Sequence, residues 1–181
     1  MTILQLDSSI TGEHSVSRQL TAATVAQLVA ANPGVAVTHR DLAANPLPHL
    51  TLADLGGDND VLDQFLAADT IVIGAPMYNF TIPTQLKAWI DRIAIAGKTF
   101  RYTATGPEGL VGDKRVIIGL SRGGFYDDGN AFEHGKTYLT ALFGFIGITP
   151  EFVHADGIAI GPDQRAEAIA NGLGEVQKLA A

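Results

Sequence analysis

The chain has 181 residues, 46% of them hydrophobic, and carries a formal net charge of -7 with a pI of about 5.0. An acidic surface repels phosphate backbones and anionic headgroups, which excludes nucleic acid and membrane surfaces as expected partners. The sequence contains no cysteine, which excludes disulfides, cysteine-ligated metals and thiol catalysis.

The hydrophobic content is enough to bury the core of one domain, which we expect to cover residues 1–181. The first residues do not combine a basic segment with a long apolar core. No apolar run approaches the roughly 18 residues of a membrane span. We therefore expect a soluble, cytoplasmic protein.

Short apolar runs alternate with helical patterns along the chain. The runs are rich in β-branched residues, as strands buried on both faces tend to be, and cover Ile3–Leu6, Val35–Thr38, Thr70–Ile73, Val116–Leu120 and Phe152–His154. The helical patterns fall near Ala22–Val29, Val61–Ala68, Leu86–Ile93, Leu139–Ile146 and Ala166–Leu173. Right-handed crossovers then favour an α/β fold, a five-stranded parallel sheet of order 2-1-3-4-5 with helices on both faces.

The segment Leu42–Asp60 contains two prolines and two glycines, and we interpret it as a long loop. Three aspartates follow one another near its end, at Asp58, Asp60 and Asp63. Acidic side chains are favoured by the dipole at a helix start, so we interpret them as a solvated first turn.

In an open parallel sheet, ligands bind at the carboxyl ends of the strands where the strand order reverses, so the loops after the first, third and fourth strands should converge. The first loop reads SSITGEHSVS and leads into a helix beginning near Ser17. Free N–H groups and a positive dipole end would then meet several hydroxyls, which together favour a phosphate monoester. Arg18 is the only adjacent cation, which indicates a site that holds an anion mainly by hydrogen bonds. An ordinary Ser/Thr cap is the alternative.

The second loop, GAPMYNFTIP, runs from Gly74 to Pro83. Pro76 and Pro83 stiffen its ends, while Met77, Tyr78 and Phe80 supply flat or polarizable surface. Asn79 adds a donor and an acceptor. This combination suits a planar heteroaromatic ring, although Met77 or Phe80 taken singly also fits a core position.

The third loop, SRGGFYDDG, follows the fourth strand. Gly123 and Gly124 allow backbone to approach a ligand without a β-carbon in the way. A simple glycine turn is the alternative.

Five segments together resemble the FMN-dependent NADH-azoreductase family, flavodoxin-like quinone and azo-dye reductases. They read LDSSITGEHSVS, APMYNFTIPTQLKAWID, TFRYTATGPEGLVG, SRGG and FGFIGIT, and the likeness runs from Met1 to about Gly161. The resemblance implies a flavodoxin-like three-layer sandwich and one non-covalent FMN per subunit. NADH or NADPH would be the hydride donor, and quinones or azo compounds the acceptors.

The resemblance also assigns roles to residues. It implies that FMN is bound by Ser9, Ser15, Val16, Ser17, Pro76, Met77, Tyr78, Asn79, Phe80, Ser121, Arg122, Gly123 and Gly124. In that family the first loop holds the phosphate, the second lies along the isoalloxazine and the third meets its pyrimidine edge. The substrate pocket would be lined by Tyr102, Phe125, Tyr126 and Phe145, with Phe145 reaching in from a second subunit.

Two features depart from the family pattern. The stretch Leu42–Asp60 is shorter than its counterpart, which helps to wall the substrate pocket. Val16 replaces a polar residue, so only its backbone N–H can serve a phosphate.

The implied chemistry is two-electron, ping-pong hydride transfer at flavin N5, with no side chain acting as a nucleophile. The Asn79 amide and the Gly123–Gly124 backbone would support it by stabilising charge at the ring edge. A homodimer would cover the ring. The apolar set Phe143, Phe145, Ile146 and Trp89 provides a candidate dimer face, with ordinary core packing as the alternative.

Two other classes of protein remain open. The sequence Gly119–Gly123 matches G-x-S-x-G with Ser121 as nucleophile, and Asp127, His134 and His154 follow, as a serine hydrolase requires. However, the glycines and aspartates after Ser121 predict irregular chain rather than the helix of a nucleophile elbow. A flavodoxin-type electron carrier would share the flavin loops. Metal catalysis is not expected, because the five histidines are scattered.

Overall fold

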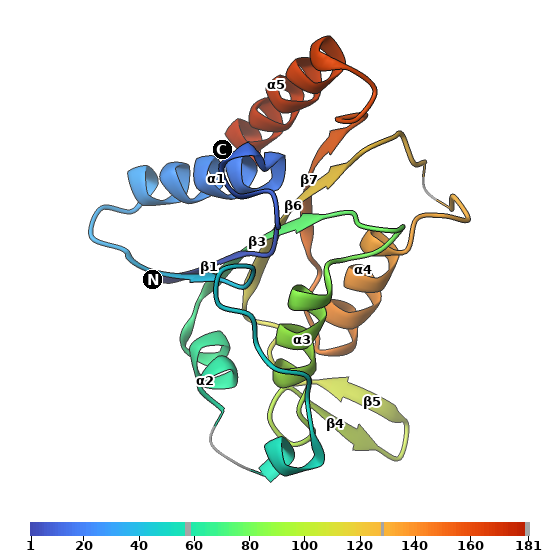
Figure 1. Ribbon diagram of the computed structural model, residues 1–181. Coiled ribbons are helices and arrows are strands. Elements are labelled where there is room, and N and C mark those ends of the chain that lie inside the picture. Colours follow the sequence, from blue (N-terminus) through green and yellow to red (C-terminus); the bar gives the residue numbers. More distant parts are fainter. Residues whose placement is uncertain (57–58, 128, 180–181) are drawn as a thin grey trace.

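The structure, a computed structural model, describes residues 1–56, 59–127 and 129–179. A parallel five-stranded sheet forms its centre, in the order β2-β1-β3-β6-β7 (Figure 1). The strands are β1 (Thr2–Asp7), β2 (Ala36–Asp41), β3 (Thr70–Pro76), β6 (Arg115–Arg122) and β7 (Glu151–Asp156). This is the expected 2-1-3-4-5 arrangement, so the predicted fold class is confirmed.

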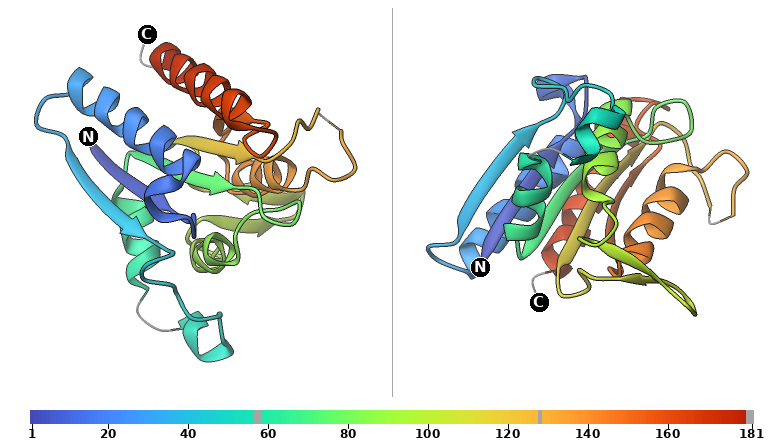
Figure 2. Two further views of the ribbon diagram at one scale, coloured as in Figure 1. Left: turned by 45° about the horizontal axis from the view of Figure 1, so that its top comes forward. Right: turned by 90° about the horizontal axis from the view of Figure 1, so that it is seen from below.

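Helices cover both faces of the sheet. α1 (Val16–Ala31) and α5 (Pro162–Leu179) lie side by side on one face. α2 (Asp60–Ala67), α3 (Thr84–Ile93) and α4 (Gly135–Phe145) lie on the other, as Figures 1 and 2 show. Each face has its own apolar core, because side chains of a strand point alternately to the two sides.

Two glycines bring the start of α1 close to the sheet. Gly74 of β3 pairs with Gly119 of β6. A β-carbon on Gly74 would lie 3.0 Å from Asp7 Oδ1, and one on Gly119 would lie 3.0 Å from the Cβ atom of Leu20. Both would also lie 3.5 Å from the Ser17 carbonyl oxygen. The first turn of α1 therefore packs over the carboxyl-end half of the sheet, where the candidate site lies.

A second, antiparallel sheet pairs β4 (Phe100–Thr103) with β5 (Gly106–Gly109). The sequence patterns predicted no strand there. Phe100 is the buried anchor of this hairpin, and its ring lies 4.5 Å from that of Phe145 between centroids.

The long loop from Leu42 contains one short 3-10 helix, η2 (Leu52–Gly56), among its described residues. Gly57 and Asp58 lie outside the described residues. Asp60 is an exposed first-turn residue of α2 that pairs with Arg40, and Asn59 caps the helix by accepting from the Leu62 N–H at 3.1 Å. For Asp60 and Asp63 the predicted helix start is confirmed.

The prediction that Phe143, Ile146 and Trp89 form a dimer face is wrong. All three side chains are 0% exposed and belong to the core beneath α3 and α4. Trp89 meets Phe65 edge to face at 5.9 Å between ring centroids. Phe145 is the one member of the set that is partly exposed, so ordinary core packing accounts for the other three.

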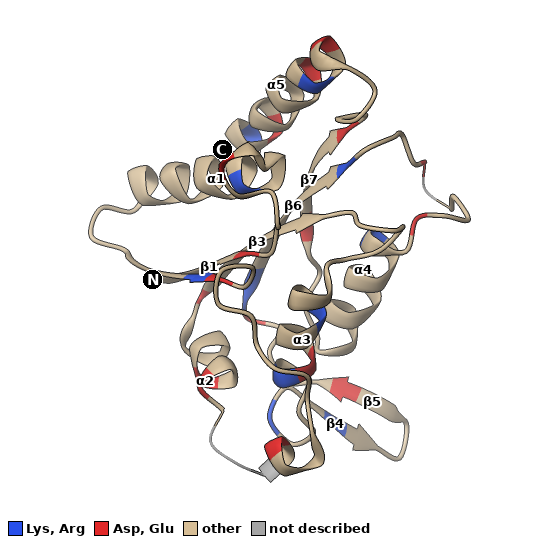
Figure 3. Cartoon of the chain, viewed as in Figure 1, with Lys and Arg blue, Asp and Glu red and all other residues tan. Residues whose placement is uncertain are grey.

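Charge is distributed unevenly over the two helices of the first face. Arg18 is the single charged residue of α1, whereas α5 carries both signs (Figure 3). Across the described ranges, no helix is long and apolar enough to span a bilayer.

Candidate functional site

The hydroxyl-rich turn joins β1 to α1. Ser15 is the N-cap of α1, and its Oγ atom accepts from the Arg18 N–H at 3.2 Å and lies 3.1 Å from Ser17 Oγ. Ser9 Oγ lies 3.0 Å from Thr11 Oγ1. Ser9, Ser15 and Ser17 are each at most 3% exposed. The turn thus places hydroxyls beside the free N–H groups of a helix start, the arrangement that binds phosphate.

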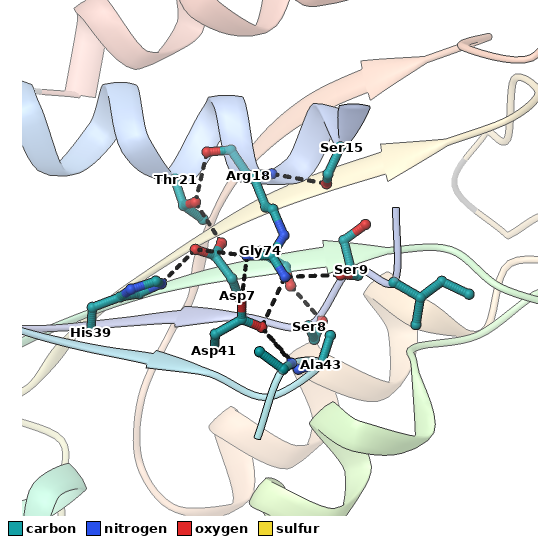
Figure 4. Close-up of polar contacts among 12 residues, drawn as sticks. Asp7, Ser8, Ser9, Ser15, Arg18, Thr21, His39, Asp41, Ala43 and Gly74 are labelled. Atoms are coloured by element: carbon teal, nitrogen blue, oxygen red, sulfur yellow. Dashed lines mark hydrogen bonds and ion pairs between the residues drawn. The ribbon is translucent and has the colours of Figure 1, made fainter. Parts of the chain in front are cut away.

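Asp7 anchors this turn from below (Figure 4). Its buried carboxylate accepts from Thr21 Oγ1 at 2.8 Å and from Gln5 Nε2 at 3.1 Å, and it lies 2.8 Å from His39 Nε2. These partners belong to α1, β1 and β2. The carboxylate therefore fixes the helix start against two neighbouring strands.

Arg18 is held by Asp41 at the end of β2. Its Nη1 and Nη2 atoms donate to the two carboxylate oxygens at 2.7 and 2.8 Å, and Nη2 also donates to the Ser9 carbonyl at 3.0 Å (Figure 4). The Arg18 guanidinium is the main cause that lowers the pKa of Asp41 from 3.8 to about 2, and the Ala43 and Ala44 N–H groups assist. The cation next to the turn is thus already engaged by a carboxylate.

The loop after β3 makes a tight reversal with two residues in the left-handed region. Tyr78 and Thr81 exchange backbone hydrogen bonds of 2.9 and 3.1 Å, and the residues between them, Asn79 and Phe80, have φ angles of 47° and 72°. Positive φ at both central residues is typical of a type I′ turn. Asn tolerates this conformation well, whereas for a bulky residue such as Phe it stores about 1–3 kcal/mol.

Contacts from the segment before α4 hold the strained turn. The His134 N–H donates to the Phe80 carbonyl at 2.9 Å, and the rings of Phe80 and Phe132 lie 5.1 Å apart between centroids. A backbone held in a strained state by its surroundings is commonly a functional one.

Hydrogen bonds join the three loops. Tyr78 Oη lies 3.2 Å from Ser9 Oγ and accepts from the Ile10 N–H at 3.1 Å. The Met77 N–H donates to the Ser121 carbonyl at 2.8 Å. The loops after β1, β3 and β6 therefore converge, as predicted from the strand order.

A cleft of about 460 Å³ opens between these loops. Its lining residues are Ser9, Thr11, His14, Ser15, Val16, Pro76, Met77, Tyr78, Ser121, Gly123, Ile158, Ala159 and Arg165. Eight residues of the predicted cofactor site are among them. A second hollow, of about 590 Å³, shares Met77 and Tyr78 with this cleft, and Asn79 lines it.

The remaining predicted cofactor residues lie around this cleft rather than in its lining. Ser17 is buried beneath the turn. Arg122 is 4% exposed and makes a bidentate ion pair with Asp156, at 2.7 and 2.6 Å. The Gly124 carbonyl accepts from the Gly157 N–H at 3.1 Å, and Phe80 packs on Phe132.

The predicted substrate-pocket residues fall into two groups, the neighbours Phe125 and Tyr126 after β6, and Tyr102 and Phe145, whose rings both contact that of Phe100. Phe125 lines a separate hollow with His154 and Asp156. The ring of Tyr126 lies 5.7 Å from the Arg122 guanidinium carbon. Tyr102 is 74% exposed on the β4–β5 hairpin, where its ring contacts Phe100. Their role in substrate binding stays a prediction.

Sequence reasoning missed one wall of the cleft. Ile158, Ala159 and Arg165 follow β7, the fifth strand of the sheet. The carboxyl ends of all parallel strands lie at the same edge of the sheet, so the loop after β7 also reaches this edge. The predicted strand order could therefore have indicated that these residues line the cleft. A β-carbon on Gly123 would lie 3.3 Å from the Cβ atom of Ala159, which shows how closely this wall approaches.

Ser121 does not occupy a nucleophile elbow. It belongs to β6 and is 2% exposed, and residues 123–127 are irregular, as predicted. The next helix, α4, begins only at Gly135. Within the described ranges, no group of three or more His, Asp and Glu is placed to hold a metal ion.

Comparison with known proteins identifies the family. The family model for the flavodoxin-like fold matches residues 1–180. An FMN-dependent NADH:quinone oxidoreductase 2 from Bradyrhizobium diazoefficiens is 54% identical, and the alignment covers 100% of both chains. The chain belongs to the FMN-dependent NADH:quinone oxidoreductase family.

Solved structures of the family have the same architecture. The azoreductase AzrA is 35% identical and superimposes with a TM-score of 0.89 over 99% of each chain. An FMN-dependent NADH-azoreductase from Bacillus anthracis str. Ames Ancestor, solved in complex with FMN, is 26% identical with a TM-score of 0.86, over 99% of this chain and 98% of that one. The resemblance stated from the sequence motifs is therefore confirmed.

The Bradyrhizobium relative also contains residues without a counterpart here. Its alignment spans 201 positions, whereas this chain has 181 residues. This chain is thus shorter than that relative by about 20 aligned positions, and the shortening of the Leu42–Asp60 loop stays a prediction.

Proposed function

We propose that the protein is an FMN-dependent NAD(P)H:quinone oxidoreductase that also cleaves azo compounds reductively. The observation that carries the proposal is a single cleft with a hydroxyl-lined end at the start of α1 and an apolar, aromatic wall after β3. The names of its relatives, FMN-dependent NADH:quinone oxidoreductase and azoreductase, agree with this chemistry.

The residues of the cleft fit a phosphorylated flavin. A volume of about 460 Å³ lies in the range of small-molecule sites. At one end, Ser9, Ser15 and the N–H groups of the first turn of α1 would hold the phosphate. At the other, Pro76, Met77 and Tyr78 would contact the tricyclic ring, with Ser121 and Gly123 at its polar edge.

When bound, FMN supplies a centre at N5 that accepts a hydride from NADH or NADPH and passes two electrons to a quinone or azo acceptor. The chain's own residues would position the flavin ring and polarise its edge. The Asn79 amide is presented by a backbone locked in the left-handed region, so it needs little reorganisation to donate a hydrogen bond. Backbone N–H groups of Gly123 and Gly124 would stabilise negative charge at the ring edge.

We also propose that the single domain of residues 1–181 works as a homodimer. Exposed aromatic side chains outside the cleft support this, since Tyr102 is 74% and Phe125 61% exposed. Phe145, partly exposed at the end of α4, would reach the partner's site. The donor is a cytoplasmic metabolite, which supports a cytoplasmic location, and the net charge of -7 argues against nucleic acid and anionic membranes as partners.

The visible spectrum of the purified protein tests the cofactor. We expect flavin absorbance after incubation with FMN, and bleaching on anaerobic addition of NADH. A preparation that takes up no FMN would overturn the proposal.

Steady-state assays separate the proposed enzyme from its two rivals. An oxidoreductase turns over NADH with quinone, whereas a flavodoxin-type carrier exchanges single electrons with proteins and oxidises NADH poorly. Labelling of Ser121 by a fluorophosphonate would instead favour a serine hydrolase.

A further inference from the structure

Two arginines border the turn after β1, and they lie on different sides of it. Arg18 lines an outer hollow together with Asp41 and Ala43, and it is absent from the lining of the flavin cleft. Its Nη1 and Nη2 atoms are bound by the Asp41 carboxylate and the Ser9 carbonyl. The charge of Arg18 is therefore used to hold β2 and the turn together.

Arg165 approaches the turn from the opposite side. It lies in the first turns of α5, where its N–H donates to the Gly161 carbonyl at 2.9 Å. Its Nη2 atom donates to the His14 carbonyl at 2.5 Å, one residue before the helix cap Ser15. Among the described residues that line the cleft, Arg165 is the only arginine or lysine.

A phosphate monoester carries about 1.5 to 2 negative charges at neutral pH. Hydroxyls and backbone N–H groups can satisfy its oxygens, but they do not neutralise it, and the chain itself has a net charge of -7. Asp163 and Glu167 of α5, together with Glu13 of the turn, make this edge more acidic still. A guanidinium beside the phosphate offsets this repulsion and can donate two parallel hydrogen bonds.

We propose that Arg165 is the charge partner of the FMN phosphate, and that Arg18 positions the turn without contacting the cofactor. This inference rests on the proposed FMN site and deepens it. Arg165 already contacts the β1–α1 turn. On binding, the phosphate would contact both Arg165 and this turn, so the cofactor would connect α5 to α1. Arg165 would then add to the preference for FMN over riboflavin, which lacks the phosphate, beyond what the hydroxyls and N–H groups of the turn supply.

The test compares Arg165→Gln and Arg165→Lys with Lys178→Gln. Lys178 is an exposed residue far along the same helix, so its replacement removes the same charge from α5 without touching the cleft. Apoprotein is titrated with FMN and with riboflavin, and binding is followed by quenching of flavin fluorescence. Thermal unfolding of each apoprotein checks its fold.

We expect Arg165→Gln to weaken FMN binding roughly tenfold and to leave riboflavin binding within about twofold. Arg165→Lys should recover part of the loss, and Lys178→Gln should match the wild type. The preference of the wild type for FMN should also fall as sodium chloride is raised, a measurement that needs no variant.

An unchanged FMN-to-riboflavin ratio in Arg165→Gln, with tight FMN binding by the wild type, would overturn the role of Arg165 and leave the proposed function standing. Failure of the wild type to bind FMN at all would overturn both. If Arg165→Gln does not fold, a salt-independent FMN preference in the wild type would be sufficient to refute the proposal.

Discussion

The phenol oxygen of Tyr78 lies 3.2 Å from the Oγ atom of Ser9 and so connects the loop after β3 to the turn after β1. The same oxygen accepts the Ile10 N–H at 3.1 Å. One hydroxyl thus sets the distance between the end of the cleft that we assign to the phosphate and the wall that we assign to the ring.

Replacement of Tyr78 by Phe should loosen this connection. We expect FMN affinity to fall about three- to tenfold and the free energy of unfolding to fall by about 0.5–1.5 kcal/mol, since two hydrogen bonds are lost without a cavity. Tyr138→Phe is the matched control, because that hydroxyl belongs to a half-buried ring on α4, away from the cleft. Equal FMN affinity in the two variants would contradict the role given to Tyr78.

Asn79 combines an amide group with a left-handed backbone, and two substitutions separate these properties. Asn79→Gly keeps the backbone at φ 47° without strain, whereas Asn79→Ala should lower the free energy of unfolding by about 1 kcal/mol. Both remove the amide, and we expect both to slow flavin reduction by NADH roughly tenfold, as measured by stopped-flow absorbance. If Asn79→Gly reduced its flavin at the wild-type rate, the Asn79 amide would have no role in hydride transfer.

Asp41 should make stability depend on pH in the acid range. Its pKa is lowered from 3.8 to about 2 in the folded protein, so ionisation favours folding; this contribution is complete above about pH 4 and is lost as the pH falls through 2. Asp41→Asn should lower the free energy of unfolding by about 1–2 kcal/mol near neutral pH. Thermal unfolding from pH 6 to 2 should show the two proteins converging at the acid end, and parallel profiles would contradict the assignment.

Gly109 lies where the β4–β5 hairpin meets the end of α4. A β-carbon there would overlap the backbone of Ile146 and Gly147, which cannot move as a side chain can. We expect Gly109→Ala to lower the free energy of unfolding by more than about 3 kcal/mol. In Gly174→Ala on α5 the new methyl group meets open space, so that variant should be stabilised by about 0.5–1 kcal/mol, and chemical denaturation measures both.

Continuous apolar runs explain why the sheet could be predicted from the sequence. All seven residues of β3 are buried, and seven of the eight residues of β6 are buried, because helices cover both faces. The β4–β5 hairpin lacks such a run. Phe100 is its one buried residue, each strand is only four residues long, and β5 begins and ends with glycine. Its formation depends on contacts with α4 that sequence periodicity does not contain.

Those parts of the candidate site that follow from the strand order could be predicted. Those that depend on contacts between side chains far apart in the sequence could not. Ser9, Met77 and Ser121 lie in loops that had to converge at one sheet edge. The ion pair of Arg18 with Asp41 joins residues 23 positions apart, and nothing in either local sequence indicates it. The error over Trp89 and Phe143 has a related cause, since helical spacing marks an apolar face without showing which surface covers it.

The walls of the cleft come from residues 9–16, 76–78, 121–123 and 158–165, four stretches that only the finished fold assembles. A ligand that contacts all four binds the native state and not the unfolded chain, so it shifts the folding equilibrium by mass action. Cellular abundance of the protein would then depend on riboflavin supply. Starvation for the vitamin should shorten its half-life against intracellular proteases, even where transcription is constant.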